Sequence, residues 1–311
     1  MTNPRTEHLI TACLDGSDEA YQGLRWAADL VRGHAADIIL LHVRKQDALH
    51  SFGGINPSIV QQSILHSGME IPGQDILQFG REILIELGNL DDRWTEHTRI
   101  DSIGGDPIGD HFIQYTNPDG HRIGLKLKAS SDIATGILEQ QSQFDYQTII
   151  LGAPEIESGD APGKLSAVVR KVAIKADCGV VVARHIGEGH GHLIAIDDSV
   201  GSIERIERAQ FIIKNFFEPV TLMAVAQSTD SEGTTKFNLD QVTSRFCEWG
   251  VEHINTLYYQ GDTVQAFVDH SQDYGLTMIA MEKKNRPLQF FSDSQVIRIL
   301  EESHNSVMLT P

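Results

Sequence analysis

One pattern of residues occurs twice along this chain of 311 residues: an apolar run, an Asp-x-Ser triplet, a helical spacing of apolar residues and a second apolar run. Asp197 follows Asp15 by 182 residues, and Val225, in the second apolar run of its copy, follows Val43 by the same 182 residues. Because the spacing is equal at both ends, the two copies align without a gap. A repeat of this size predicts two domains, in a chain long enough for about two domains of ~150 residues each.

Strand-like and helical stretches alternate through both copies. The predicted strands cover 8–14, 37–43, 122–128, 148–151 and 180–183, and then 193–196, 220–225, 253–259, 276–281 and 307–309. The first predicted helix begins after Ser17. Further helices are predicted at 74–87, from 131, at 165–176, at 203–217, at 238–250, from 261 and at 294–303. Alternation of this kind is typical of a parallel sheet with right-handed crossovers. The predicted fold class is therefore α/β, with two tandem doubly wound parallel-sheet domains.

The first half is longer than the second. Met281 follows Leu151 by only 130 residues, so the first half carries 52 extra residues between its second and fourth strands. We place them in two inserts, at about 46–72 and 95–120. The tetrapeptide Asn117-Pro-Asp-Gly120 is a turn signal between two strand-like runs, so the second insert is predicted to form a β-hairpin.

The two predicted domains are separated by a stretch rich in Gly and His that lacks periodicity. The first domain covers 1–184, including both inserts, and the second covers 191–311. Residues 185–190 form the predicted linker.

The composition excludes several classes of partner. Lys and Arg total 25 against 43 Asp and Glu, and the net charge of −18 repels nucleic-acid backbones and anionic membrane surfaces. There is no apolar run of ~18 residues and no apolar segment behind a basic start, so we expect a cytoplasmic protein with no membrane contact. The three cysteines are far apart in the sequence, and we interpret them as buried reduced thiols rather than a disulfide framework or a zinc site.

These motifs resemble a known family. A strand, Asp15-Gly16-Ser17, an Ala- and Leu-rich helix, a strand ending in Leu41-His-Val43 and a later Ile149-Ile-Leu-Gly152 are similar to the universal stress protein domain. Residues 166–178 resemble the last helix and final turn of that family. The resemblance covers nearly all of both halves apart from the inserts, and it points to the tandem, two-domain members. It implies the fold of the adenine nucleotide alpha hydrolase-like proteins.

Many members of that family bind ATP at the carboxyl ends of the strands, where phosphates meet helix N-termini and bare glycine backbone. The nucleotide-binding version of the family has Gly-x2-Gly-x9-Gly-Ser after the fourth strand. In the first half Gly152 supplies the first glycine, but the second position holds Glu155, whose charge and bulk oppose a phosphate. In the second half, no glycine occurs between Met281 and Ser294, and Asp293 takes the place of the last glycine.

The candidate cofactor-binding residues follow from the resemblance: Asp15, Gly16, Ser17, Val43, Gly152, Lys164 and Ser166. Asp15 would face the adenosine, the backbone of Val43 would meet the adenine, and Lys164 with Ser166 would rebuild an anion site. The expectation is nevertheless a degenerate crevice with no cofactor, and ATP binding in the first domain is the alternative. Asp15 is interpreted as a helix cap or ligand contact rather than a general base.

No catalytic or metal-binding motif is recognisable, so the protein is not expected to be an enzyme. We expect a non-enzymatic universal stress protein in the stress response. Because family members dimerise through their last strands, its two domains are expected to pack as an intramolecular pseudo-dimer through Val180 to Ala183 and Val307 to Leu309. A protein partner is expected but not identified, and assembly into a homo-oligomer is left open. The alternatives are an ATP-dependent regulatory switch and, third, a nucleotide-processing enzyme with the 95–120 insert as a lid.

Overall fold

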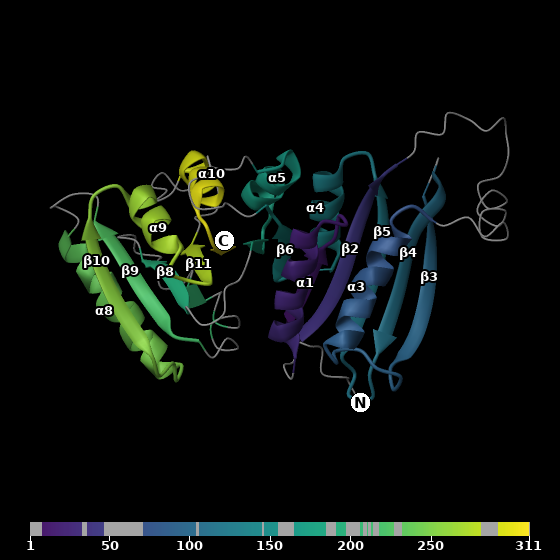
Figure 1. Ribbon diagram of the computed structural model, residues 1–311, viewed down its shortest axis with the longest axis horizontal. Coiled ribbons are helices and arrows are strands. Elements are labelled where there is room, and N and C mark those ends of the chain that lie inside the picture. The colour runs from purple at the N-terminus through teal and green to yellow at the C-terminus, as the bar shows by residue number, and fades with distance from the viewer. Residues whose placement is uncertain are drawn as a thin grey trace. The chain divides into compact units, whose positions relative to one another are not determined.

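The structure is a computed structural model, and its contacts divide the chain into two compact units, Met1–Gly152 and Ala153–Pro311. It describes residues 8–32, 36–46, 71–103, 106–144, 146–154, 165–184, 191–196, 206–207, 210, 213, 218–226, 232–280 and 292–310 (Figure 1). Most of the first predicted insert, the predicted linker and most of the helix predicted at 203–217 lie outside these residues. The domain limits predicted from the sequence stay a prediction.

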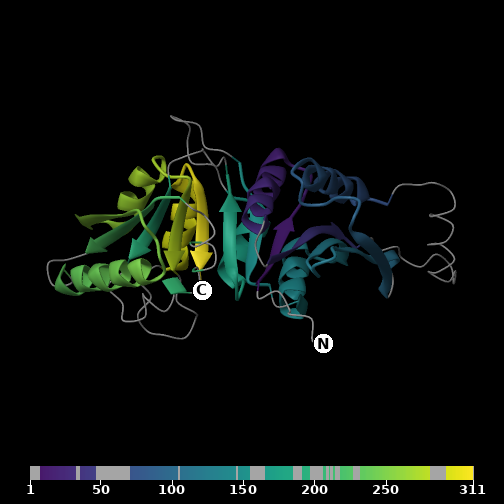
Figure 2. The same cartoon turned by 90° about the horizontal axis from the view of Figure 1, so that it is seen from below.

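The first unit is a six-stranded sheet with helices on both faces. Its elements in chain order are β1 (His8–Cys13), α1 (Asp18–Val31), β2 (Ala36–Lys45), α3 (Gln74–Glu86), β3 (Thr95–Ile103), β4 (Asp106–Thr116), β5 (Arg122–Ser130), α4 (Ile133–Phe144) and β6 (Thr148–Gly152). The strands lie in the order β6-β1-β2-β5-β4-β3. β6, β1, β2 and β5 are parallel to their neighbours in this series, and β4 and β3 extend the sheet antiparallel. α1 and α3 cover one face and α4 covers the other (Figure 2).

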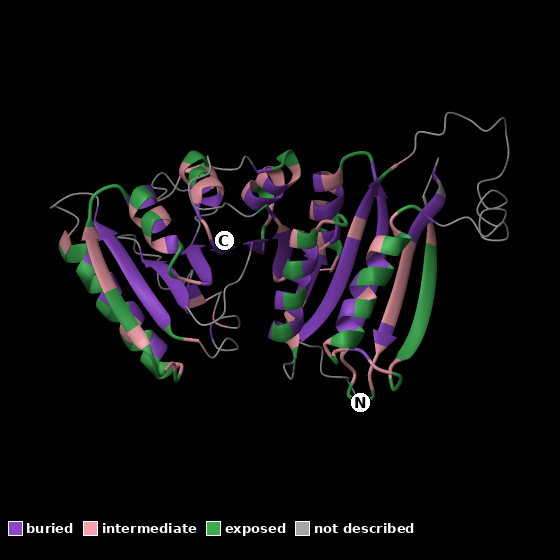
Figure 3. Ribbon diagram, in the orientation of Figure 1, coloured by how far each residue is buried: buried purple, intermediate pink, exposed green. Residues whose placement is uncertain are grey.

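This arrangement explains why the strand sequences are apolar along their whole length. A strand covered by helices on both faces has no side for water, so its inward and outward residues are both apolar. β2 is buried at eight of its ten positions. β3, at the edge, is by contrast exposed along most of its length (Figure 3).

The second unit repeats the same plan without a hairpin. Its elements are α5 (Ala167–Lys175), β7 (Gly179–Ala183), β8 (His192–Ile196), β9 (Val220–Ala226), α8 (Glu232–Glu248), β10 (Ile254–Gln260), α9 (Thr263–Ser271), β11 (Leu276–Ala280), α10 (Asp293–Glu302) and β12 (Ser306–Thr310). The strands lie in the order β10-β9-β8-β11-β12-β7. The four pairs from β10 to β12 are parallel, and β12 and β7 pair antiparallel, with Val307 opposite Val182 and Leu309 opposite Val180.

The predicted α/β class, with alternating strands and helices in both halves, is confirmed. The predicted hairpin is also confirmed, because β4 and β5 pair antiparallel around the turn at Asn117 to Gly120. The sequence did not predict β3, whose polar residues lack the alternation of a half-buried strand. α8 begins at Glu232 and not at 238, because Thr235 is fully buried and a Lys236–Glu232 ion pair stabilises the first turn. The prediction of buried thiols holds for Cys178, whereas Cys13 is partly exposed and Cys247 is exposed.

Candidate functional site

The predicted crevice begins at the loop between β1 and α1. The Asp15 carboxylate accepts hydrogen bonds from the backbone N–H of Ser17 (3.0 Å) and from its hydroxyl (2.6 Å). The Ser17 hydroxyl oxygen in turn accepts from the N–H of Ala20 (3.2 Å), which makes Ser17 the N-cap of α1. Gly16 has a φ of 91°, a conformation that favours glycine. The predicted helix start is confirmed, and Asp15 and Ser17 both have partners inside the loop.

Gly152, at the end of β6, lies directly against the first turn of α1. A Cβ atom at this position would lie 2.4 Å from the backbone nitrogen of Ala20 and 2.7 Å from the carbonyl carbon of Glu19. Both neighbours are backbone atoms, which cannot move aside as the tip of a side chain can. The contact of β6 with α1 therefore requires a glycine here, whether or not a ligand is bound.

The first turn of α3 covers the other side of the loop. The Ile76 side chain would lie 3.3 Å from a Cβ atom on Gly16, and the Tyr21 hydroxyl donates to the Ile76 carbonyl oxygen (3.3 Å). Burial raises the pKa of Tyr21, and the nearby carboxylates Asp75, Asp15 and Asp18 raise it further. His42 donates from Nδ1 to the Leu14 carbonyl oxygen (2.7 Å) and so joins the ends of β1 and β2.

The other predicted residues have different surroundings. The Val43 side chain is buried, and a Cβ atom on Gly136 of α4 would lie 2.7 Å from its Cγ1. Ser166 belongs to the second unit and is the N-cap of α5, where its hydroxyl accepts from the N–H of Val169 (3.2 Å). Lys164 lies outside the described residues, as do Glu155 and the second-half loop after Ala280. The structure thus brings together Asp15, Gly16, Ser17 and Gly152.

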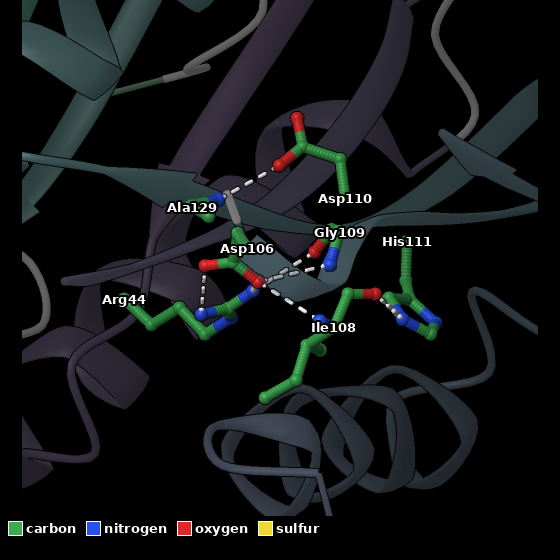
Figure 4. A network of polar contacts seen from close by, with 7 residues as sticks. All are labelled: Arg44, Asp106, Ile108, Gly109, Asp110, His111 and Ala129. Carbon is green, nitrogen blue, oxygen red and sulfur yellow. Dashed lines mark hydrogen bonds and ion pairs between the residues drawn. The ribbon is translucent and has the colours of Figure 1, made fainter. Parts of the chain in front are cut away.

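A buried polar network, shown in Figure 4, lies where β2 ends beside the hairpin. The guanidinium of Arg44 donates two hydrogen bonds to the carboxylate of Asp106 (2.8 and 2.6 Å) and one to the carbonyl oxygen of Gly109 (3.0 Å). The side chains of Arg44 and Asp106 are 6% and 0% exposed. Burial alone would raise the pKa of Asp106, but the hydrogen bonds and charge of Arg44, with backbone N–H donors, outweigh burial and lower the pKa.

Two lysines of β5 continue the ionic contacts. Lys126 pairs with Asp110 (3.3 Å), whose carboxylate also accepts from the N–H of Ala129 (2.8 Å), and Lys128 pairs with Glu139 of α4 (3.3 Å). Both lysine side chains are buried. Sequence reasoning missed this network, although Lys126 and Lys128 alternate with leucine in a strand predicted to be covered on both faces. Two of the three carboxylates belong to β4 and so come with the hairpin.

Among the described residues, no cluster of three His, Cys, Asp or Glu side chains is placed to hold a metal ion. Within the same residues, no helix is long and apolar enough to cross a membrane.

Comparison with known proteins bears on the first unit above all. Residues 8–93 match the model of the universal stress protein family. This stretch of the chain is similar to a universal stress protein domain. The match covers β1, α1, β2 and α3 of that domain, including the loop at Asp15, and it ends at Arg93, two residues before the hairpin strand β3. No curated protein matches the chain.

Solved structures match the whole chain in fold. A universal stress protein from Archaeoglobus fulgidus DSM 4304 is 13% identical, with a TM-score of 0.62 and 97% of each chain covered. A protein of unknown function from Pseudomonas aeruginosa PAO1 is 13% identical, with a TM-score of 0.56 and coverage of 97% of this chain and 92% of that one. The cytoplasmic domain of a prokaryotic cation chloride cotransporter is 10% identical, with a TM-score of 0.51 and coverage of 97% and 94%. At these identities the likeness shows the fold alone, a universal stress protein-like α/β architecture.

Proposed function

We propose that the protein is a non-enzymatic universal stress protein that acts in the cytoplasm through a protein partner, without a resident nucleotide. One observation carries this proposal: Asp15, Ser17 and Gly152, the positions that resemble nucleotide contacts, all have partners within the loop and α1. The Asp15 carboxylate is bound by Ser17, Ser17 caps the helix, and Gly152 packs on its backbone. These residues are thus explained by the fold without a ligand.

Charge supports the same proposal. A phosphate at the start of α1 would compete with the Ser17 hydroxyl for the N–H of Ala20, and it would come close to the exposed carboxylate of Asp15. The chain as a whole has a net charge of −18, which opposes the approach of ATP. The sequence also places a carboxylate, Glu155, at the position of the second glycine in the family's phosphate loop.

The second part of the proposal is that the two repeats pack as an intramolecular pseudo-dimer. Within the second unit, β7, which the sequence assigns to the first predicted domain, pairs antiparallel with β12, which it assigns to the second. Beside this pair, the ion pair of Arg170 with Glu301 joins α5 to α10.

Arg184 supports this packing from the end of β7. Its side chain is almost fully buried, and it donates to the carbonyl oxygens of Pro154 (3.1 Å), Asn305 (3.4 Å) and Leu300. Its backbone N–H also donates to the Ser306 hydroxyl (3.0 Å). Burial lowers the pKa of Arg184 to about 10, so the guanidinium is still charged at neutral pH. A cation buried among carbonyl groups of both repeats favours a fixed contact between them.

Equilibrium dialysis with ATP and with ADP tests the first part. We expect no saturable binding at millimolar nucleotide and no release of phosphate from ATP. The informative variants are Asp15→Ala and, as a matched control, Asp240→Ala at an exposed position of α8. ATP binding that Asp15→Ala removes and Asp240→Ala retains would replace the proposal with the regulatory switch. ATP hydrolysis with the same pattern would show an enzyme.

A further inference from the structure

The first unit contains a cavity of about 490 Å³ at the end of the sheet opposite the predicted nucleotide crevice. It lies where β2 and β5 begin, whereas the nucleotide-type loop lies where β1 and β6 end. Its walls come from the end of α1, the segment 88–94 before β3, and the turn between β4 and β5. Its volume falls within the range of pockets that bind small organic molecules.

Three arginines line this cavity, and each is anchored on one side. Arg122 donates from Nε to Asp37 (2.7 Å) and from its backbone N–H to the same carboxylate (2.8 Å). Asp37 is only 2% exposed, so it holds one edge of the guanidinium from the buried side. Among the described residues, the two terminal nitrogens of Arg122 have no hydrogen-bond partner, and the side chain is 47% exposed.

Arg93 and Arg32 are likewise bound through only part of their guanidinium groups. Arg93 donates from Nε and one terminal nitrogen to Asp91 (2.9 and 2.6 Å), and Arg32 donates from one terminal nitrogen to the Leu87 carbonyl oxygen (3.1 Å) and pairs with Asp29 (3.2 Å). In the described part of the chain, each keeps a further terminal nitrogen without a partner. Guanidinium groups anchored on one edge and open on the other are the common way to bind a carboxylate or phosphate.

The remaining lining suits the organic part of such a ligand. Ile38 and Ile123 provide a buried apolar floor, and Trp94 provides an aromatic ring at the wall. Because Asp91 and Asp119 also line the cavity, the charges of the three arginines are largely balanced. Selection would therefore depend on hydrogen-bond geometry and apolar contact more than on net charge.

From this combination we propose that the cavity binds a small organic oxyanion, a molecule with a carboxylate or phosphate group on an apolar or aromatic body. The anionic group would lie on the open edges of Arg122, Arg93 and Arg32, and the body would lie on the floor and on Trp94. The site depends on the insert, because Trp94 and the turn residues precede or belong to the hairpin. The corresponding connection in the second unit, 249–253 between α8 and β10, is too short to build it. This site is independent of the proposed function.

Isothermal titration calorimetry of the full chain tests this site with three matched probes: benzoate, phenyl phosphate and neutral benzyl alcohol. We expect saturable binding of benzoate or phenyl phosphate with one site per chain, and at least about tenfold weaker binding of benzyl alcohol. The first two probes distinguish a carboxylate ligand from a phosphate ligand. No saturation by either anion at millimolar concentration, or equal binding of benzyl alcohol, would overturn the proposal.

Variants locate the binding. Arg122→Gln and Arg93→Gln should each weaken the binding of the anionic probes at least about tenfold. Arg99→Gln, on the exposed strand β3 and outside the cavity lining, should leave affinity unchanged. Arg122→Gln removes the charged partner of buried Asp37, which keeps only its hydrogen bond from the backbone N–H of residue 122, so circular dichroism checks the fold of this variant. Exposed Arg93 supplies the variant that is free of this problem. Affinity unchanged in Arg93→Gln and Arg122→Gln, or lost equally in Arg99→Gln, would also contradict the site.

Discussion

Gly152 ends β6 where the first turn of α1 lies against the strand, and the space for a side chain is already filled by backbone atoms. Ser17 caps the same helix turn. Both residues belong to the pattern that resembles a nucleotide loop, yet both are required by the packing of α1. At this scale, a residue retained from a family motif does not by itself indicate a retained ligand.

Gly152→Ala tests this explanation. Its Cβ would overlap the nitrogen of Ala20, so either β6 or α1 must shift, and we expect a loss of about 2–4 kcal/mol in the free energy of unfolding. The matched control is Gly233→Ala in α8, where no described atom outside the adjacent residues and the helix's own nearby backbone lies within 4 Å of the new Cβ, and where alanine favours the helix. Urea unfolding of both variants measures the difference. Equal stability of the two variants would show that Gly152 is not a packing glycine.

His192, at the start of β8, is 3% exposed, and its burial lowers its pKa to about 4. In the unfolded chain the pKa is about 6.5, so between these values the unfolded state binds a proton that the native state does not. The contribution of neutral, buried His192 to the free energy of unfolding is therefore fully present above pH 6.5. It declines by on the order of 3 kcal/mol as the pH falls towards 4. Urea unfolding from pH 8 to 4.5 should show this decline. The decline with pH should be smaller in His192→Leu. It should be unchanged in His253→Gln, which replaces a histidine exposed at the surface.

At the scale of elements, the antiparallel strands β3 and β4 are attached to the parallel sheet by hydrogen bonds of β4 to β5 and by buried charges rather than by an apolar face alone. Arg44 reaches across to Asp106, and Lys126 to Asp110. A buried ion pair adds little to stability compared with an apolar contact, but it costs much when one partner is removed. Such pairs fix which residues of β4 meet the end of β2.

Asp106→Asn is the variant that tests this attachment. This substitution keeps the shape of the side chain but leaves the guanidinium of Arg44 buried without a countercharge. We expect the free energy of unfolding, measured with urea, to fall by about 3–5 kcal/mol. Asp101→Asn breaks the exposed pair with Arg99 and should cost at most about 1 kcal/mol. Because the pKa of Asp106 is lowered, its contribution is present above the unfolded pKa of about 3.9 and is lost as pH falls below it. Equal costs for the two variants would contradict the buried network.

At the scale of the whole molecule, the proposed pseudo-dimer depends on the pairing of β7 with β12, two strands of the second unit. An unpaired β7 would leave an apolar strand edge open to solvent, which favours aggregation. Val180, Val181 and Val182 are all buried. The pseudo-dimer proposed above therefore predicts that the repeats stay together without a covalent connection.

A protease site placed within 185–190 tests this prediction. After cleavage, the two fragments should elute together in size-exclusion chromatography, because β7–β12 pairing and the hydrogen bonds of Arg184 hold them. Met308→Asp puts a charge into the buried centre of β12 and should separate the fragments, whereas Asp293→Ala, exposed at the start of α10, should not. Fragments of the unsubstituted protein that separate at once would show that the repeats do not form a pseudo-dimer.

The sequence by itself determined what depends on short-range patterns. The alternation of apolar runs, the cap at Ser17 and the turn at Asn117 to Gly120 involve residues close in the chain, and each produced the predicted element. The 182-residue repeat was found by comparing such local patterns in the two halves. The loop at Asp15 was located in the same way.

Only the tertiary structure decided the features that join distant residues. β3 is polar and becomes a strand because β4 offers it a hydrogen-bonded edge, and α8 extends to Glu232 because Thr235 is buried. Arg44 and Asp106 are 62 residues apart, and the cavity draws its lining from five separate elements and turns. Periodicity carries no information on such pairs, because it reports which face of one element is buried and not which residue of another element it meets.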